Sequence, residues 1–332
     1  MTIDQVLKRS VKEFPNNIAV SGIEENTISV IEFKEKVNKI SGFLKDQGIV
    51  SGDRVAIISE NTPNWGVAYF AITTMGAVAV PIMTEFQSAD VHHILKHSGS
   101  KGIFISAKLY EKIEEFKSEL LTTYILIDDF SIIPHNKTTD LISEKLKDGK
   151  REFAKILDAA LKFVGVKHDE VKEDDLAAIV YTSGTTGHSK GVMLTHKNIV
   201  FDAIATSGFV GMKPGDRMLS QLPLAHTMEC TLDNFGVRAG ASGTVLHGME
   251  VKIVNADETT GEGDVYIKGP NVMIGYYKDP EKSKEVLTED GWFISGDLGY
   301  LDKDGYLFLK GRSKNVIIGS NGKNIYPEEI ES

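Results

Sequence analysis

The sequence predicts an α/β fold, in which a large multi-layer α/β domain carries a β-rich subdomain. Two observations support this prediction. Over the first 230 residues, strand-like apolar stretches alternate with helix-like stretches, which is typical of a largely parallel sheet. From about Gly243, short strands and tight turns replace that alternation. The two patterns indicate that different architectures follow one another along the chain.

The α/β part divides into strands and helices by the spacing of its apolar residues. Helices are predicted where apolar residues form buried or amphipathic segments of ten residues or more, with Ser88 and Thr195 as expected N-caps. The predicted strands are 53–59, 77–82, 102–106, 124–128 and 176–183, and the predicted helices are 65–76, 88–99, 151–164 and 195–205.

The β-rich part contains short alternating strands. The clearest are 249–254, 263–269 and the pair that spans 293–312. Asp302-Lys-Asp-Gly305 joins that last pair, and a tight turn of this composition predicts a β-hairpin.

The composition excludes several classes of protein. The chain of 332 residues has a formal net charge of −10 and no Lys/Arg-rich arm, so we expect no nucleic-acid partner. No apolar run reaches the length of a membrane span, and the N-terminus does not resemble a signal peptide. Cys230 is the only cysteine, which excludes an intramolecular disulfide and suits a cytoplasmic location.

The stretch Tyr181-Thr-Ser-Gly-Thr-Thr-Gly-His-Ser-Lys-Gly191 predicts a phosphate-binding loop. It follows a predicted buried strand and precedes a predicted helix, where backbone N–H groups converge on an anion. Its glycines allow close approach and positive φ, while its hydroxyls and Lys190 add donors. It is not a Walker A loop, which would end in Gly-Lys-Ser/Thr. A flexible surface linker is the alternative interpretation, and the buried strand before the loop disfavours it.

With its continuation to His196, this stretch resembles the phosphate-binding signature of the adenylate-forming, or AMP-binding, superfamily. Further segments resemble the same superfamily in the expected order, over nearly the whole chain. They are SENTPNW (59–65), MGAVAVPI (75–82), LPLAHTMEC (222–230), GDLGYLDKDGYLFLKGRSKNVI (296–317) and GKNIYPEEIES (322–332). Among the branches, the chain looks most like the long-chain fatty acid–CoA ligases.

The resemblance implies roles for individual residues. Asp297 would accept hydrogen bonds from the ribose hydroxyls and Arg312 would contact ribose or phosphate; a turn aspartate and a surface arginine are the alternatives. The phosphate-binding residues would be Thr182, Ser183, Gly184, Thr185, Thr186, Gly187 and Lys190, the catalytic ones Thr182, Lys190 and His226, and the hinge residue Lys314. His226 is equally consistent with a core histidine, and Lys314 with an exposed linker lysine. No side chain is assigned to a metal, and His93 and His97 are expected to be solvated helix positions.

The resemblance also implies a reaction. An acid–thiol ligase of this type activates a fatty acid with ATP and Mg²⁺ to acyl-AMP and transfers the acyl group to coenzyme A. Its partners would be these small molecules, and peripheral membrane contact is compatible with a fatty-acid substrate. The implied domains are a large domain over 1–312, with an α/β part at 1–236 and a β-rich subdomain at 237–312, followed by a hinge and the start of a small α+β domain at 313–332.

Two features depart from the family pattern. Only LDNFG (232–236) joins two flanks that the family separates by a long segment with a Tyr-Gly-x-Thr-Glu motif, whose glutamate binds Mg²⁺. The sequence also reaches Ser332 soon after the hinge, before the late lysine that serves adenylation. These departures favour the alternative of a shortened, non-catalytic nucleotide-binding remnant. An adenylation domain for another carboxylic acid is a third interpretation, which the missing segment disfavours because most of its acid-binding pocket would lie there.

Overall fold

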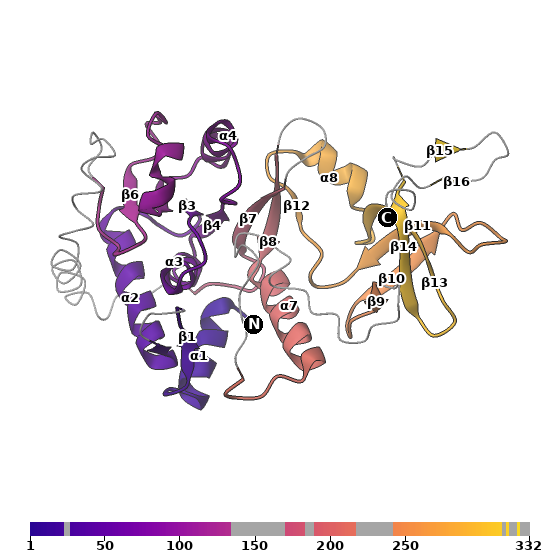
Figure 1. The fold of residues 1–332 in the computed structure, drawn as a ribbon, viewed down its shortest axis with the longest axis horizontal. Coiled ribbons are helices and arrows are strands. Elements are labelled where there is room, and N and C mark those ends of the chain that lie inside the picture. The colour runs from indigo at the N-terminus through magenta and orange to yellow at the C-terminus, as the bar shows by residue number, and fades with distance from the viewer. Residues whose placement is uncertain are drawn as a thin grey trace. The chain divides into compact units, whose positions relative to one another are not determined.

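The computed structural model describes residues 1–22, 27–133, 170–182, 189–216, 242–313, 317–318 and 324–325 (Figure 1). The chain forms two compact units. Unit 1 comprises Met1–Val200 and Lys213–Thr231, and unit 2 comprises Phe201–Met212 and Leu232–Ser332. The predicted helix at 151–164 and the predicted boundary at 236/237 lie outside the described residues, so both stay predictions.

Unit 1 contains a mostly parallel sheet, which confirms the α/β prediction. Its strands follow the order β8-β7-β4-β3-β5-β6, and β8 alone among them runs antiparallel to its neighbour. Their bounds are β3 (Arg54–Ile58), β4 (Val78–Pro81), β5 (Gly102–Ile105), β6 (Thr123–Leu126), β7 (Leu176–Thr182) and β8 (Lys190–Thr195). Because β4 and β5 lie on opposite sides of β3, the intervening helices cover both faces of the sheet.

The helices of unit 1 begin at short polar caps. Thr2, Ser29 and Thr62 accept a hydrogen bond from the backbone N–H three residues on. The expectation that Ser88 caps its helix is wrong, because Ser88 is the first helical residue and Gln87 N–H donates to Asp90 Oδ2 at 3.3 Å. The elements are α1 (Ile3–Glu13), α2 (Val30–Asp46), α3 (Pro63–Thr74), α4 (Ser88–Ser98), the 3-10 helix η1 (Ala107–Lys112) and the hairpin β1 (Ile18–Val20)–β2 (Ile28–Ser29).

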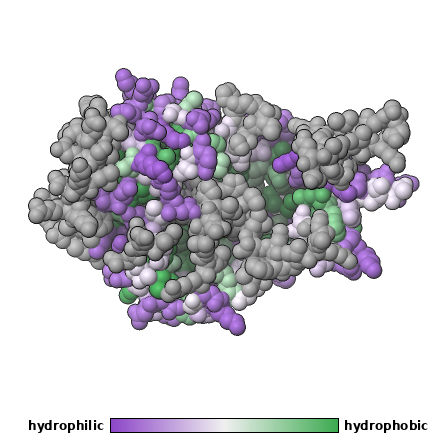
Figure 2. Space-filling view, in the orientation of Figure 1, coloured by the Kyte–Doolittle hydropathy of each residue, from purple (hydrophilic) through white to green (hydrophobic). Residues whose placement is uncertain are grey.

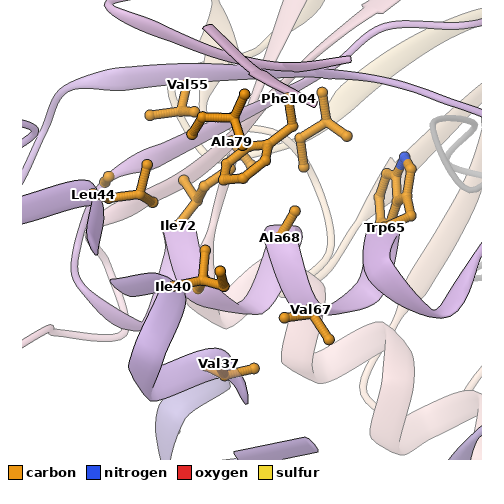
Figure 3. Close-up of a cluster of buried hydrophobic side chains, with 14 of the residues drawn as sticks. Val37, Ile40, Leu44, Val55, Trp65, Val67, Ala68, Ile72, Ala79 and Phe104 are labelled. Carbon is orange, nitrogen blue, oxygen red and sulfur yellow. The ribbon is translucent and has the colours of Figure 1, made fainter. Parts of the chain in front are cut away.

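The core of unit 1 lies between α2, α3 and one face of the sheet (Figure 3). Val55 and Phe104 lie on the strands above Ile72 of α3, and all three side chains are fully buried (Figure 3). Trp65, near the N-terminal end of α3, packs against the same cluster. The near-continuous apolar strands therefore reflect a sheet that is covered on both faces.

Unit 2 is built around an antiparallel sheet, which confirms the prediction of a β-rich part. The strand order is β10-β11-β13-β14-β9, and the predicted hairpin is the β13–β14 pair. The bounds are β9 (Gly243–Thr244), β10 (Glu250–Val254), β11 (Gly263–Lys268), β12 (Gly275–Tyr276), α8 (Pro280–Val286), β13 (Phe293–Leu301), β14 (Tyr306–Arg312), β15 (Ile317–Ile318) and β16 (Asn324–Ile325).

Unit 2 has few buried apolar side chains. Among its described residues, Val265 of β11 is the only large apolar side chain that is buried, while Leu309 of β14 is 44% exposed. Most other side chains of the sheet are half-buried. Helix α7 (His196–Val210) begins in unit 1 and continues into unit 2.

Within the described ranges, no helix has the length and apolar character needed to cross a membrane. On the face drawn in Figure 2, hydrophilic side chains are the most prominent among the described residues, and hydrophobic ones show as smaller patches. Peripheral membrane contact stays a prediction.

Candidate functional site

The predicted phosphate loop connects two antiparallel strands, which corrects the expectation that a helix follows it directly. Thr182 ends β7 and Lys190 begins β8, and the two residues lie opposite each other in the ladder. Gly-Val-Met-Leu-Thr (191–195) favours a strand because alternate side chains pack on the sheet while its backbone pairs with the edge of β7. The loop is therefore closed at its base by a β-ladder.

The helix that follows begins at His196, as a capped element in its own right. Asn198 N–H donates to Thr195 Oγ1 at 3.2 Å, and Thr195 N–H donates to Asn198 Oδ1 at 2.7 Å. These bonds confirm Thr195 as the cap. Because β8 separates the loop from this helix, phosphate binding at the loop would depend on the loop's own N–H groups and side chains.

Thr182 and Lys190, the last ladder pair before the loop, form what we call the neck of the loop. Residues directly opposite in an antiparallel ladder project from the same face, so the Thr182 hydroxyl and the Lys190 ammonium group share one face. Thr182 is exposed and Lys190 is half-buried. The other predicted phosphate-binding residues, Ser183, Gly184, Thr185, Thr186 and Gly187, lie outside the described residues.

Gly191 is needed for space, not for an unusual backbone angle. It is not among the described glycines with positive φ. A Cβ on Gly191 would lie 2.8 Å from Ile179 Cγ2 and 3.1 Å from Tyr181 Cζ, closer than side chains pack. The glycine therefore lets the Tyr181 ring lie against β8 at the base of the loop.

Asp297 and Arg312 are paired across the β13–β14 hairpin in unit 2. Arg312 Nε lies 3.1 Å from Asp297 Oδ1, and the two residues are Cα partners in the ladder. The register shifts by one residue between Leu298 and Gly299, which places Arg312 opposite Asp297 in place of Gly311. The spacing of fifteen residues between them thus results from one tight turn and one bulge.

Hydrogen bonds to Ser295 hold this pair in position. Asp297 N–H donates to Ser295 Oγ at 3.0 Å, and Ser295 Oγ donates to the carbonyl of buried Val265 at 2.9 Å. Arg312 Nη1 donates to the Ser295 carbonyl at 3.0 Å. Since the arginine side chain is 61% exposed, the ion pair contributes little to stability, about 0.2–1 kcal/mol. Its effect is to orient the Asp297 carboxylate.

His226 and Lys314 lie outside the described residues, so their predicted roles stay predictions. In the part of the chain that the structure describes, no three His, Cys, Asp or Glu side chains come together in a way that could hold a metal ion.

The chain is similar in sequence to two named proteins and in fold to a solved structure. The chain is 24% identical to the putative acyl-CoA synthetase YngI of Bacillus subtilis, over 99% of this chain and 82% of that protein. It is 24% identical to the long-chain-fatty-acid–CoA ligase FadD13 of Mycobacterium tuberculosis, over 89% and 75% of the two chains. The ATP-bound structure of MatB from Rhodopseudomonas palustris is 22% identical, with a TM-score of 0.80 over 100% of this chain and 82% of that one.

The alignment with YngI also confirms that relatives contain residues that this chain lacks. It spans 463 positions, whereas this chain has 332 residues, so at least 131 positions have no counterpart here. That most of this difference lies between Thr231 and Val237 stays a prediction from the resemblance of the flanking motifs.

A family model described as AMP-binding enzyme matches residues 7–242, which is more than half of the chain and includes both strands that flank the phosphate loop. Together with the shared fold, this match shows that the chain belongs to the AMP-binding enzyme family.

Proposed function

We propose that the chain binds ATP, activates a fatty acid as acyl-AMP and transfers the acyl group to coenzyme A. The observation that carries the proposal is the neck of the phosphate loop, where Thr182 and Lys190 present a hydroxyl and an ammonium group from one face of a β-ladder. Relatives named for fatty acids support this substrate class. Others are named for 2-succinylbenzoate and 4-coumarate. The relatives therefore share the transfer to coenzyme A in their names but not the acid, and a fatty acid is our specific proposal for this chain.

Adenylation requires the phosphates of ATP to be held while a carboxylate attacks the α-phosphorus and pyrophosphate leaves. In our proposal, Thr182 and Lys190 with the N–H groups of the loop meet the negative charge on the phosphates. Asp297 accepts hydrogen bonds from the ribose hydroxyls, and Arg312 keeps its carboxylate oriented. In the proposal the metal enters with the substrate as MgATP, and no residue is assigned to it.

The missing segment favours a second candidate function. At least 131 positions of YngI have no counterpart here, and the family's Tyr-Gly-x-Thr-Glu motif is absent from the sequence. A chain that keeps the loop and Asp297 without that motif would bind a nucleotide without completing the reaction. This candidate is a non-catalytic nucleotide-binding protein of the same fold.

One assay separates the two candidates. The protein, confirmed at 36.4 kDa by intact mass, is incubated with palmitate, ATP, Mg²⁺ and coenzyme A, and pyrophosphate and acyl-CoA are measured. Pyrophosphate release that depends on palmitate, together with acyl-CoA, supports the ligase. Nucleotide binding without either product supports the second candidate. A protein that neither binds MgATP nor releases pyrophosphate contradicts both.

A further inference from the structure

The C-terminal turn of α4 contacts the strand that leads into the phosphate loop. His97 Nδ1 and the Tyr181 hydroxyl oxygen lie 2.7 Å apart, and the two rings meet edge-on with centroids 5.8 Å apart. The tautomer of the imidazole decides which group donates. The sequence suggested a solvated helix position for His97, but its ring is half-buried and bonded to a residue 84 positions away.

Tyr181 is held tightly between two elements. Its side chain is 2% exposed, and its ring lies against Gly191, its partner on β8. The hydroxyl at the far end of the ring reaches His97. The phenol therefore links α4 to the base of the loop, one residue before Thr182.

The histidine lies on a fixed support. Arg54 donates from Nε to the Ser98 carbonyl at 2.8 Å and from Nη2 to the Gly99 carbonyl at 3.0 Å, so the end of α4 is tied to the start of β3. The His93 ring stacks on the His97 ring at 5.6 Å with an interplanar angle of 12°. A side chain restrained in this way fixes what it binds, since it has little freedom of its own.

We propose that His97 is a positioning residue for the nucleotide, which holds the neck of the 182–191 loop through the Tyr181 hydroxyl. The inference rests on the proposed binding of ATP phosphates at this loop. A neck that is already ordered loses less conformational entropy when phosphates bind, so the affinity for ATP rises without any contact between His97 and ATP. The bond should affect ATP affinity and leave the affinity for the acyl substrate unchanged.

The test is a double-mutant cycle read by calorimetry with MgATP on the full chain. Tyr181→Phe and His97→Leu should each weaken MgATP binding about five-fold, the usual effect of one hydrogen bond. The double variant should bind no more weakly than either single variant, because both changes remove the same interaction. His97→Gln, which retains a hydrogen-bonding group, should recover most of the affinity.

His92→Leu is the matched control, because His92 lies on the same helix and its Nε2 contacts the Lys112 carbonyl at 3.0 Å, away from Tyr181. It should bind MgATP as the wild type does. In the Trp292→Phe background, a urea unfolding curve of Trp65 fluorescence that is unchanged from the parent protein shows that unit 1 remains folded in each variant. If the wild type binds MgATP and both single variants bind it as tightly as the wild type does, or if the two effects add in the double variant, the inference is wrong and the proposed function stands. If the wild type does not bind MgATP, both are wrong.

Discussion

The two units of this chain differ most in how completely their sheets are covered. In unit 1, Val55 and Ile57 are entirely buried between helices, whereas in unit 2 Val265 is the single buried large apolar side chain among the described residues. Burial of apolar area is the main favourable term in folding, so unit 1 should carry most of the stability.

Each unit contains one of the chain's two tryptophans, Trp65 in unit 1 and Trp292 in unit 2. Variants with a single tryptophan, Trp65→Phe or Trp292→Phe, therefore report the unfolding of one unit at a time. With this pair of probes, the effect of any substitution on the unfolding free energy can be measured separately for each unit.

The largest expected effect on stability comes from replacing one buried valine by alanine in the core of each unit. Val55→Ala should lower the unfolding free energy of unit 1 by about 3 kcal/mol. The neighbouring side chains are fully buried and tightly packed, so they cannot move into the cavity that the two missing methyl groups leave. Val265→Ala should cost about 1 kcal/mol in unit 2, where half-buried neighbours can collapse. Urea unfolding followed by each tryptophan measures both. Equal costs would refute the difference in packing.

The two units should respond to pH in opposite directions. Complete burial lowers the pKa of His196 in unit 1 from 6.5 to about 4, so its neutral form is favoured in the folded state. That contribution is present above pH 6.5 and is lost as the pH falls toward 4. Unit 1 should therefore lose about 2 kcal/mol between pH 7 and pH 5, and His196→Asn should abolish this loss.

In unit 2, burial raises the pKa of Asp202 from 3.8 to about 6, although a hydrogen bond from Asn271 opposes the shift. The protonated form is favoured in the folded state, so its contribution is present below pH 3.8 and is lost as the pH rises through 6. Unit 2 should lose about 1 kcal/mol between pH 5 and pH 7. Asp202→Asn should remove this dependence, and a unit 2 that gained stability over the same range would contradict the assignment.

A smaller effect is expected at the base of the loop. Gly191→Ala would place a methyl group 2.8 Å from Ile179 Cγ2, and overpacking of this kind costs about 1–2 kcal/mol. The loss should appear in the unfolding of unit 1, followed by Trp65. Ala178→Gly on the same sheet provides a comparison without added volume. A Gly191→Ala variant as stable as the wild type would contradict this prediction and show that the neighbouring side chains can move aside.

The smallest effect on stability should come from Arg312→Ala. The ion pair with Asp297 is exposed on the arginine side, so its loss should cost less than about 1 kcal/mol in unit 2. The same variant should weaken MgATP binding, because the Asp297 carboxylate loses its orientation. Arg312→Lys keeps the charge without the fixed geometry and should bind at an intermediate level. Normal binding by Arg312→Ala would remove this residue from the proposed site.

Local patterns predicted the fold better than they predicted contacts. Continuous apolar runs located β3 to β7, and the Asp302–Gly305 turn located the β13–β14 hairpin. The strand β8 was missed because 191–195 directly precede a helix, and only pairing with β7 reveals them as a strand. The bulge that brings Arg312 opposite Asp297, and the contact between His97 and Tyr181, depend on register and on long-range packing. Neither has a signal in the local sequence.

The most direct test of the account is calorimetry of MgATP binding to the full chain, with Lys190→Ala in unit 1 and Asp297→Ala in unit 2 as the two variants. We predict that the wild type binds MgATP and that each variant binds about ten-fold more weakly or worse, since each removes a charged hydrogen-bonding group. Lys197→Ala, a change at an exposed lysine of α7, should have no effect. Wild-type protein that does not bind MgATP, or binding that is indifferent to both Lys190 and Asp297, would contradict the account.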